Sequence, residues 1–337
     1  MDEPWTIQAI NRQLDLHRQE GDPLADEVFQ FLKNDPTTYH QFKELTSNAD
    51  LLAFALEASP KDLLDELNKQ LAEFDQVLLE QGHLVFEKYA VPIMAVLALY
   101  ALPYCYAGEN GSKVLVQSKY LVENPRKRLE ETGEFLFAVG SKNAFTHEGF
   151  GLLQCMKVRL LHAGARFYAK VDGEVSVNQE DLLGTNLAFS LITIRGLQKV
   201  GVEMSADEKY AYIYLWNCVG LLLGINSTLL PSDIRQAAVL ERAIRIRQFR
   251  PNADGATLMQ SLVDMYAEDW PFKGLRPEDM ISGFLGKEVS KCVGLDFSDI
   301  FSGASLTPMK LKNSFTRFSA DNFPRLQDQI AKGQFTF

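Results

Sequence analysis

The 337-residue sequence predicts an all-α fold, and three observations support the prediction. Segments with apolar residues at three-to-four spacing recur along the chain, as in amphipathic helices. Helix start signals precede several of these segments, namely Ser59–Pro60, Ser205 with Glu208, and 231–233 (PSD). Strand signals are few, and 174–178 (EVSVN) is at most a short hairpin arm.

The helical segments suggest one globular unit, residues 1–337, with three regions. Residues 1–85 are more charged and are expected to form peripheral helices, one of which spans 59–82 and ends at Gly82. Residues 86–245 hold the most apolar helices and are expected to form the core. Residues 246–337 contain more Pro and Gly in shorter segments, which predicts helices that wrap around this core.

The helix expected after Ser205 is apolar nearly all round, so other helices should enclose it. Gly220 and Gly224 share one of its faces and would allow another backbone to approach closely.

The most membrane-like run is 89–108 (YAVPIMAVLALYALPYCYAG). Its length is close to that of a membrane span, but two prolines interrupt it. A buried helix, or one that contacts a membrane surface, is therefore favoured over a stable span. The acidic N-terminus has no apolar signal core, so cytoplasmic residence is expected.

Charge and cysteine usage exclude several classes of protein. The net charge of −10 argues against a nucleic-acid binder, which needs a basic face. The four cysteines form no C-x-x-C pair, so a zinc ribbon or thioredoxin-like site is unsupported and buried free thiols are expected. P-loop, G-x-G-x-x-G and G-x-S-x-G motifs are absent as well.

One helix carries the most informative constellation, R-x-x-H-x-x-x-R. Arg159, His162 and Arg166 should form one row, since positions i−3 and i+4 lie on the same side as i. Two guanidiniums beside an imidazole disfavour its protonation. A neutral imidazole in an apolar helix is either a hydrogen-bonded core histidine or a metal ligand.

Partner ligands at metal-site spacing are not apparent, so His162 could not hold a bare ion. It could hold a haem, whose porphyrin supplies four donors. Arg159 and Arg166 would then bind the haem propionates through their paired donors. Alternatively, both arginines pair with acidic side chains of neighbouring helices, as buried arginines need some such partner.

The segment around His162 resembles the core of the rubber-oxygenase catalytic-domain family, which includes the latex clearing proteins and a fungal oxygenase of mycophenolic acid synthesis. After R-x-x-H-x-x-x-R come N-Q-x-D-L, then L-W-x-x-x-G-x-x-x-G-I and L-L-P, in the expected order between Lys157 and Pro231. Weaker similarity extends back to about Tyr120. The resemblance implies a globin-like helical core that binds haem b, with His162 as the proximal iron ligand and Arg159 and Arg166 in the proximal helix motif.

The resemblance also implies distal residues upstream, in 124–139 (NPRKRLEETGEFLFAV). Arg128 and Thr132 match the arginine and threonine of the rubber enzymes, but Glu131 stands where those enzymes have a lysine. This difference puts cleavage of polyisoprene in doubt. Arg128 could donate to bound oxygen and Glu131 could act as a general base, or both could belong to a solvated helix start.

The sequence therefore predicts a haem b-dependent oxygenase that acts on a small apolar, isoprenoid-like or otherwise unsaturated molecule with dioxygen or peroxide. A haem protein without turnover, serving as a gas or redox sensor or a haem carrier, is the alternative, and a metal-free helical interaction protein is a third hypothesis. Aromatic residues could wall a substrate channel or simply belong to the core: Phe135, Phe137, Phe189 and Trp216. The basic run 242–250 is expected to pair with carboxylates or to form an interaction patch, and the oligomeric state is left open.

Overall fold

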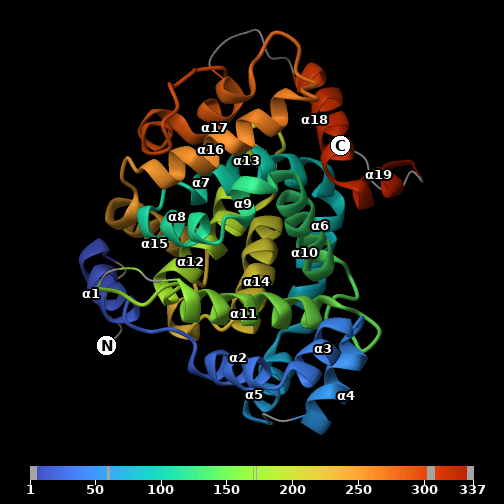
Figure 1. Cartoon of the computed structure of the whole chain (residues 1–337). Coiled ribbons are helices and arrows are strands. Elements are labelled where there is room, and N and C mark those ends of the chain that lie inside the picture. Colours follow the sequence, from blue (N-terminus) through green and yellow to red (C-terminus); the bar gives the residue numbers. More distant parts are fainter. Residues whose placement is uncertain (1–5, 59–60, 170, 172, 302–307, 332–337) are drawn as a thin grey trace.

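The computed structural model describes residues 6–58, 61–169, 171, 173–301 and 308–331 (Figure 1). Within these ranges the regular structure is helical apart from two isolated bridges, Gly108–Phe249 and Val171–Glu174. The all-α prediction is confirmed. The elements are α1 (Ile7–His17), α2 (Pro23–Asn34), α3 (Pro36–Glu44), α4 (Asn48–Ala58), α5 (Lys61–Glu73), α6 (Gln76–Val96), η1 (Leu97–Ala101), α7 (Leu102–Cys105), α8 (Glu109–Gln117), α9 (Tyr120–Glu123), α10 (Pro125–Gly140), α11 (Gly151–Tyr168), α12 (Gln179–Leu187), η2 (Ala188–Ile192), α13 (Thr193–Lys199), α14 (Ala206–Leu222), η3 (Ser227–Leu229), α15 (Ile234–Gln248), α16 (Ala253–Ala267), α17 (Pro277–Cys292), α18 (Pro308–Asn322) and α19 (Pro324–Ala331).

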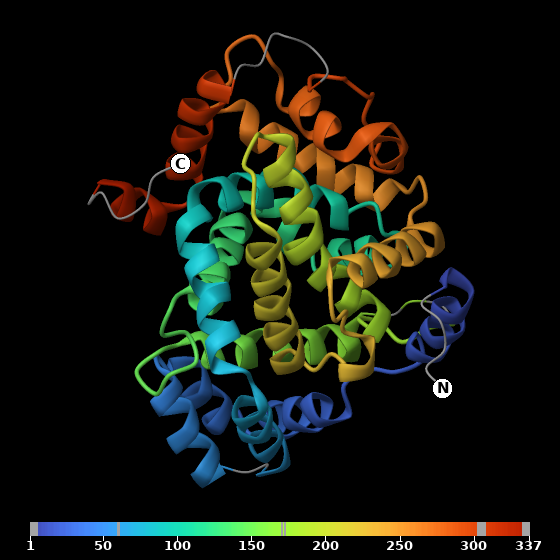
Figure 2. The ribbon, with the colours of Figure 1, turned by 180° about the vertical axis from the view of Figure 1, so that it is seen from behind.

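Helices α6 and α14 run side by side through the middle of the molecule (Figure 2). Gly82 of α6 lies at their contact, where an added Cβ would stand 2.7 Å from the carbonyl oxygen of Ala211. The expectation that a helix ends at Gly82 is therefore wrong, because this glycine serves close packing inside a helix that continues to Val96. The predicted helix 59–82 is instead divided between α5 and α6, and the Asp75 carboxylate caps the start of α6. Ser59, the cap expected for the predicted helix, lies outside the described residues.

The membrane-like run forms the end of α6 together with η1 and α7. Pro92 cannot donate to the helix and crowds the turn before it, and the backbone kinks at Tyr89 (φ −115°, ψ 19°). The stretch Gln76–Cys105 is long and apolar enough to cross a membrane, but 78% of its most apolar window is buried inside the protein. Its hydrophobicity is accounted for by the core, and cytoplasmic residence stays a prediction.

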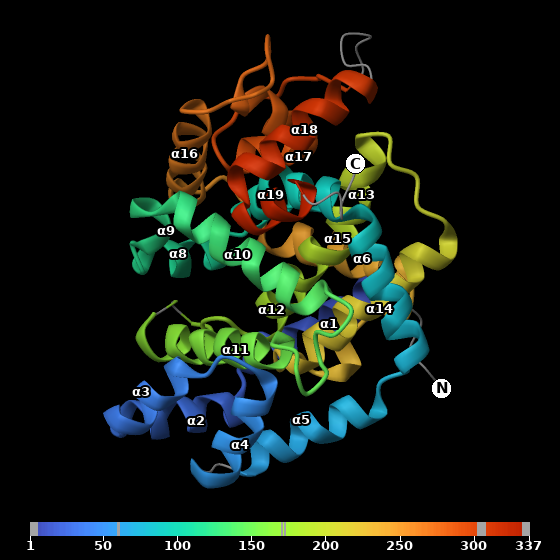
Figure 3. The ribbon, with the colours of Figure 1, turned by 90° about the vertical axis from the view of Figure 1, so that its right-hand side faces the viewer.

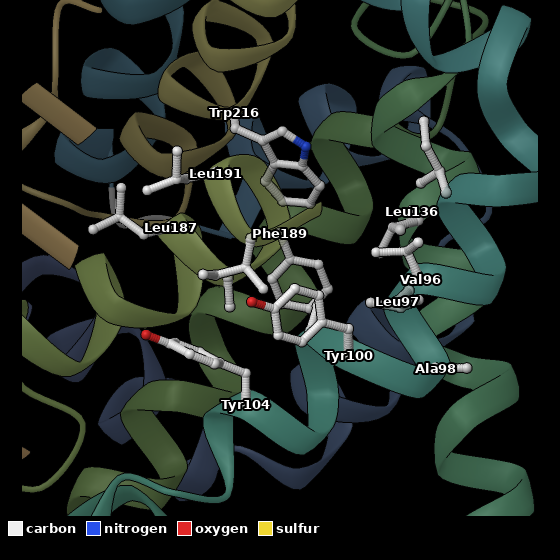
Figure 4. Close-up of a cluster of buried hydrophobic side chains, with 14 of the residues drawn as sticks. Val96, Leu97, Ala98, Tyr100, Tyr104, Leu136, Leu187, Phe189, Leu191 and Trp216 are labelled. Atoms are coloured by element: carbon white, nitrogen blue, oxygen red, sulfur yellow. The ribbon is translucent and has the colours of Figure 1, made fainter. Parts of the chain in front are cut away.

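Two π-helical segments, η1 and η2, pack against each other in this core. Figure 4 shows Tyr100 and Tyr104 reaching from the α6–α7 run toward Leu187 and Phe189 near the junction of α12 and η2. Single π-helical turns inside α-helices occur frequently at functional sites. Here they bring two interrupted helices to one edge of the core, where the cavity described below is found.

The terminal regions pack on opposite ends of this core. Helices α2 to α5 lie along one side of α11, whereas α16 to α18 lie at the far end and α1 lies beside α15 (Figures 1 and 3). The boundary expected at residue 85 falls inside α6. The helix starts expected near Ser205 and at 231–233 are confirmed by a capping box on α14 and an Asp233 cap on α15.

Candidate functional site

A cavity of about 230 Å³ lies where α10, α11 and α12 converge with η2, α7, α8 and α16. Its walls are mostly apolar. The side chains with polar oxygen or nitrogen atoms at its surface come from segments far apart in the sequence: Tyr106, Arg128, Thr132, His162, Asp181 and Thr185. The predicted proximal residue His162 and two of the predicted distal residues, Arg128 and Thr132, thus line the same space.

His162 lies in the middle of α11 and reaches the cavity from that helix. Its Nδ1 atom is fully buried and has no hydrogen-bond partner among the described residues. Burial, followed by the positive charges of Arg166 and Arg128, lowers the pKa of His162 to about 4. The imidazole is therefore neutral at physiological pH, as the sequence predicted, but the second cation is Arg128 of α10 rather than Arg159.

Arg128 and Thr132 are one turn apart on α10 and are bonded to each other. The Arg128 Nη1 atom donates to the Thr132 hydroxyl oxygen at 2.6 Å, and that hydroxyl donates to the Arg128 carbonyl oxygen at 2.9 Å. Thr132 is almost fully buried, so its hydroxyl fixes the guanidinium against the helix. A fixed positive charge is thereby held at the cavity without a carboxylate partner among the described residues.

Glu131 does not line this cavity. Its side chain is exposed and accepts a hydrogen bond from the Tyr120 hydroxyl at 2.7 Å. Adjacent positions on a helix point about 100° apart, so Glu131 faces solvent while Thr132 faces inward. The expectation that Glu131 is a base at the reaction site is therefore not supported by the structure.

The carboxyl group that does line the cavity is Asp181 of α12, which sequence reasoning did not single out. Burial, opposed by the charge of Arg18 at 3.7 Å, raises the pKa of Asp181 to about 6. A signal for it existed, because Asp181 belongs to the N-Q-x-D-L motif and shares a helix face with Thr185 and Phe189, four and eight residues on. All three line the cavity.

The other residues of that motif hold the start of α12 in place. The Asn178 side chain caps the helix by accepting from the Asp181 backbone N–H at 3.1 Å. The Gln179 amide nitrogen donates to the carbonyl oxygens of Gly21 (2.9 Å) and Gly224 (2.8 Å). One side chain thus ties α12 to the loops before α2 and after α14, which fixes the face that carries Asp181.

Arg159 does not reach the cavity. Its Nε and Nη2 atoms contact the two carboxylate oxygens of Asp22 at 2.6 and 3.0 Å, with Glu66 at 3.4 Å, and the two side chains of the Arg159–Asp22 pair are 2% and 4% exposed. The expectation that Arg159 binds a haem propionate is therefore corrected, because the paired N–H donors of its guanidinium already bind the carboxylate of Asp22. Gly224 (φ +85°) makes room for the pair, since a Cβ there would lie 2.2 Å from the Asp22 oxygen.

Arg166 also forms an ion pair with a carboxylate of the N-terminal region. Its Nε donates to Asp26 at 2.7 Å and its Nη1 to the Val177 carbonyl oxygen at 3.2 Å. Of the alternatives left open by the sequence, pairing with carboxylates of a neighbouring helix is the one that the structure shows. The row Arg159, His162, Arg166 divides into two arginines that hold α2 and one histidine that reaches the cavity.

Of the four aromatic residues considered as channel walls, Phe189 lines the cavity. Trp216 stacks behind it, with ring centroids 5.1 Å apart, and Phe137 packs edge-on against Phe86 in the core. The basic run 242–250 also meets carboxylates, since Arg247 contacts Glu180 at 3.1 Å. Of these four aromatic residues, Phe189 is the one at which the core meets the cavity; Tyr106, which was not considered, lines it as well.

The cysteines are free, as expected. Cys105 lies at the cavity wall, and burial raises the pKa of its thiol to about 12, so the free thiol is protonated at neutral pH. Within the described ranges, no cluster of three or more His, Cys, Asp or Glu side chains could hold a metal ion. His162 can supply one donor, so a metal here would need the rest of its ligands from a prosthetic group.

The geometry defines a class of protein: an all-helical small-molecule-binding protein, with a neutral imidazole and a fixed guanidinium at one largely apolar cavity. Comparison with known proteins agrees. The family described as "ER-bound oxygenase mpaB/B'/Rubber oxygenase, catalytic domain" matches residues 86–301.

The rubber oxygenase of Streptomyces sp. (strain K30) is 21% identical over 291 residues, which cover 82% of this chain and 70% of that protein. The structure of latex clearing protein LCP in the closed state has the same fold, with a TM-score of 0.67 and 16% identity over 90% of this chain and 83% of that one. The chain belongs to the mpaB/rubber-oxygenase catalytic-domain family and is an enzyme of the oxygenase type. The resemblance noted in the sequence is confirmed.

Proposed function

We propose that the protein is a haem b-dependent oxygenase acting on a small apolar, unsaturated molecule with dioxygen or peroxide, and that His162 is the iron ligand. One observation carries the proposal. His162 and the pair Arg128–Thr132, more than 25 residues apart in sequence, line one apolar cavity.

The residues fit haem by their chemistry. A neutral imidazole can be an axial ligand, and no hydrogen bond among the described residues occupies the buried Nδ1 atom of His162. The apolar walls suit the porphyrin faces. The cavity of 230 Å³ is below the ~300–1,000 Å³ of typical small-molecule sites, but it shares Val114 and Ala165 with a cleft of about 840 Å³. Together the two spaces give room for a group larger than the cavity.

Bound haem would supply four nitrogen donors and an iron that activates dioxygen. The chain's own residues have separate parts. Arg128 holds a positive charge at the cavity, which would stabilise negative charge that develops on oxygen there, and Thr132 keeps that guanidinium in position. Asp181, with its pKa near 6, can hold or release a proton at the cavity surface.

The apolar walls would orient an apolar substrate and exclude water. Leu129, Leu182 and Phe189 come from three different elements and face the same space. Walls of this kind would bind a hydrophobic molecule, or the hydrophobic part of an amphipathic one, better than a hydrophilic molecule. The name of the rubber oxygenase supports an unsaturated hydrocarbon as the substrate class.

The visible spectrum of the purified protein tests the proposal. We expect a Soret band that is lost or strongly altered in His162→Ala and unchanged in His40→Ala, whose side chain is exposed on α3. Dioxygen uptake with an unsaturated apolar substrate then separates an oxygenase from a sensor or carrier, which would show the band without turnover. Protein that stays colourless after reconstitution with haem would refute the proposal.

A further inference from the structure

An open cleft of about 840 Å³ adjoins the cavity, and the proposed chemistry gives no part to its charged side chains. Its walls are α2 and α3 on one side, α11 along its length and α8 on the other (Figure 3). Leu161 and Tyr168 of α11 line it while remaining 69% and 66% exposed. Large apolar side chains this exposed, beside a concave space, are typical of a binding site for a hydrophobic ligand.

The charges of the cleft have one sign. Among the described residues that line it, the charged side chains are Lys43 and Lys157, and none is acidic. This is unusual in a chain with a net charge of −10. Neither lysine takes part in a salt bridge with any side chain in the described ranges; Glu44 is the carboxylate that acts on Lys157 at longer range.

Both ammonium groups are held at the cleft. The Lys157 Nζ donates to the carbonyl oxygens of Leu45 (2.9 Å) and Lys43 (3.2 Å), which leaves one of its three N–H donors for another acceptor. The Lys43 Nζ lies 4.8 Å from the ring centroid of Tyr39, another cleft residue. Two cations thus stand beside an apolar groove with donor capacity left over.

We propose that this cleft binds an amphipathic carboxylate, a single long apolar chain with an acidic head group. The head group pairs with Lys43 and Lys157, and the chain lies along the apolar surface of α11. The concave shape and the volume suit one small molecule. A membrane surface is recognised instead by clusters of about four to eight basic residues, so a monomeric ligand is favoured over a bilayer.

The position of the cleft gives this site a use. Val114 and Ala165 line both the cleft and the cavity, and Ala165 is one helical turn from His162. A chain bound with its acid at the two lysines has its apolar part beside the cavity wall. The cleft would then be the entrance through which the substrate reaches the cavity. That role rests on the proposed function, whereas binding of the carboxylate does not.

The test is a fluorescence titration with cis-parinaric acid below its micelle concentration, on protein without added haem. We expect saturable binding that oleate displaces and oleyl alcohol, which has no negative charge, displaces at least tenfold less well. Lys43→Glu should weaken binding about fivefold, the upper range for one exposed ion pair, and Lys43→Glu with Lys157→Gln by tenfold or more. Lys69→Glu, at an exposed position on α5, should bind as the parent does.

Far-UV circular dichroism identifies any variant that fails to fold, and Leu161→Glu, at an exposed wall position, gives a second test of the groove. Equal displacement by oleate and oleyl alcohol, full affinity in the double lysine variant, or binding only to vesicles of anionic lipid would each overturn the inference. A missing Soret band bears on the haem proposal alone, because the titration contains no haem.

Discussion

The Arg159–Asp22 pair decides whether the arginine beside His162 serves the fold or the cofactor. Asp22→Asn removes the carboxylate charge while keeping a residue that can cap α2, where Asp22 now accepts from the Ala25 N–H at 3.2 Å. The change leaves a guanidinium that is 2% exposed without its main counter-charge. Removing one partner of a buried ion pair costs about 3–5 kcal/mol.

We expect the lower end of that range, because Glu66 stays 3.4 Å from the guanidinium and its side chain is 30% exposed. A loss of ~3 kcal/mol, with a urea m-value of ~3 kcal/mol/M for a chain of this size, lowers the unfolding midpoint by ~1 M. The assay is urea unfolding of the protein without haem, followed by circular dichroism. Asp22→Asn combined with Arg159→Met should recover most of the loss, since both charges are then gone.

Asp26→Asn is the matched control. The Asp26 carboxylate contacts Arg166 at 2.7 Å in the same helix pair. It is 35% exposed, and the buried Arg166 side chain, itself 5% exposed, also donates to the Val177 carbonyl oxygen, so loss of the Asp26 charge should cost about 1 kcal/mol, well below the cost at Asp22. If Asp22→Asn and Asp26→Asn shift the midpoint equally, or if neither shifts it by more than ~0.3 M, the structural role assigned to Arg159 is refuted.

Three further predictions concern stability. Gly224→Ala should destabilise the protein by more than ~2 kcal/mol in the same urea assay, because the residue has φ +85° and its Cβ would meet Asp22; a loss below 1 kcal/mol would contradict the close packing there. Ser205→Ala should lower the free energy of unfolding by about 1 kcal/mol through loss of the capping box, while Ser205→Asp should lower it by much less. Burial lowers the pKa of His83 to about 4, so the folded state resists its protonation: stability is complete above pH ~6.5 and falls by up to ~3 kcal/mol as the pH drops to ~4. His83→Leu should flatten that part of the pH profile, and an unchanged profile would show that other groups cause it.

The helices and their capping signals could be predicted from sequence because they depend on local chemistry. The capping box was predicted from Ser205 and Glu208, three residues apart, and the next helix start from the adjacent residues 231–233; both are present. The helix end predicted at Gly82 was wrong because glycine has two uses. It can end a helix, or it can let a neighbour approach, as Ala211 does here. Only the position of α14 in space shows which of these two uses Gly82 has.

The candidate site likewise combines residues that the sequence predicted with contacts that only the structure shows. The sequence pointed to His162, Arg128 and Thr132 by pattern and by resemblance, and the structure brings all three to one cavity. It could not say that Arg159 faces Asp22, because that contact joins residues 137 positions apart. Nor could it say that Asp181, rather than Glu131, faces the cavity.

What the sequence determined by itself was the helical class, the neutral imidazole and the family, because helical periodicity, local charge and ordered motifs are all written along the chain. Tertiary structure alone decided which cations act on His162, which carboxylates pair with the arginines, and where two lysines, in no salt bridge with a described side chain, meet an apolar cleft. The physical reason is that electrostatic energies and burial depend on distance in space, which the packing of helices sets and the spacing of residues along the chain does not.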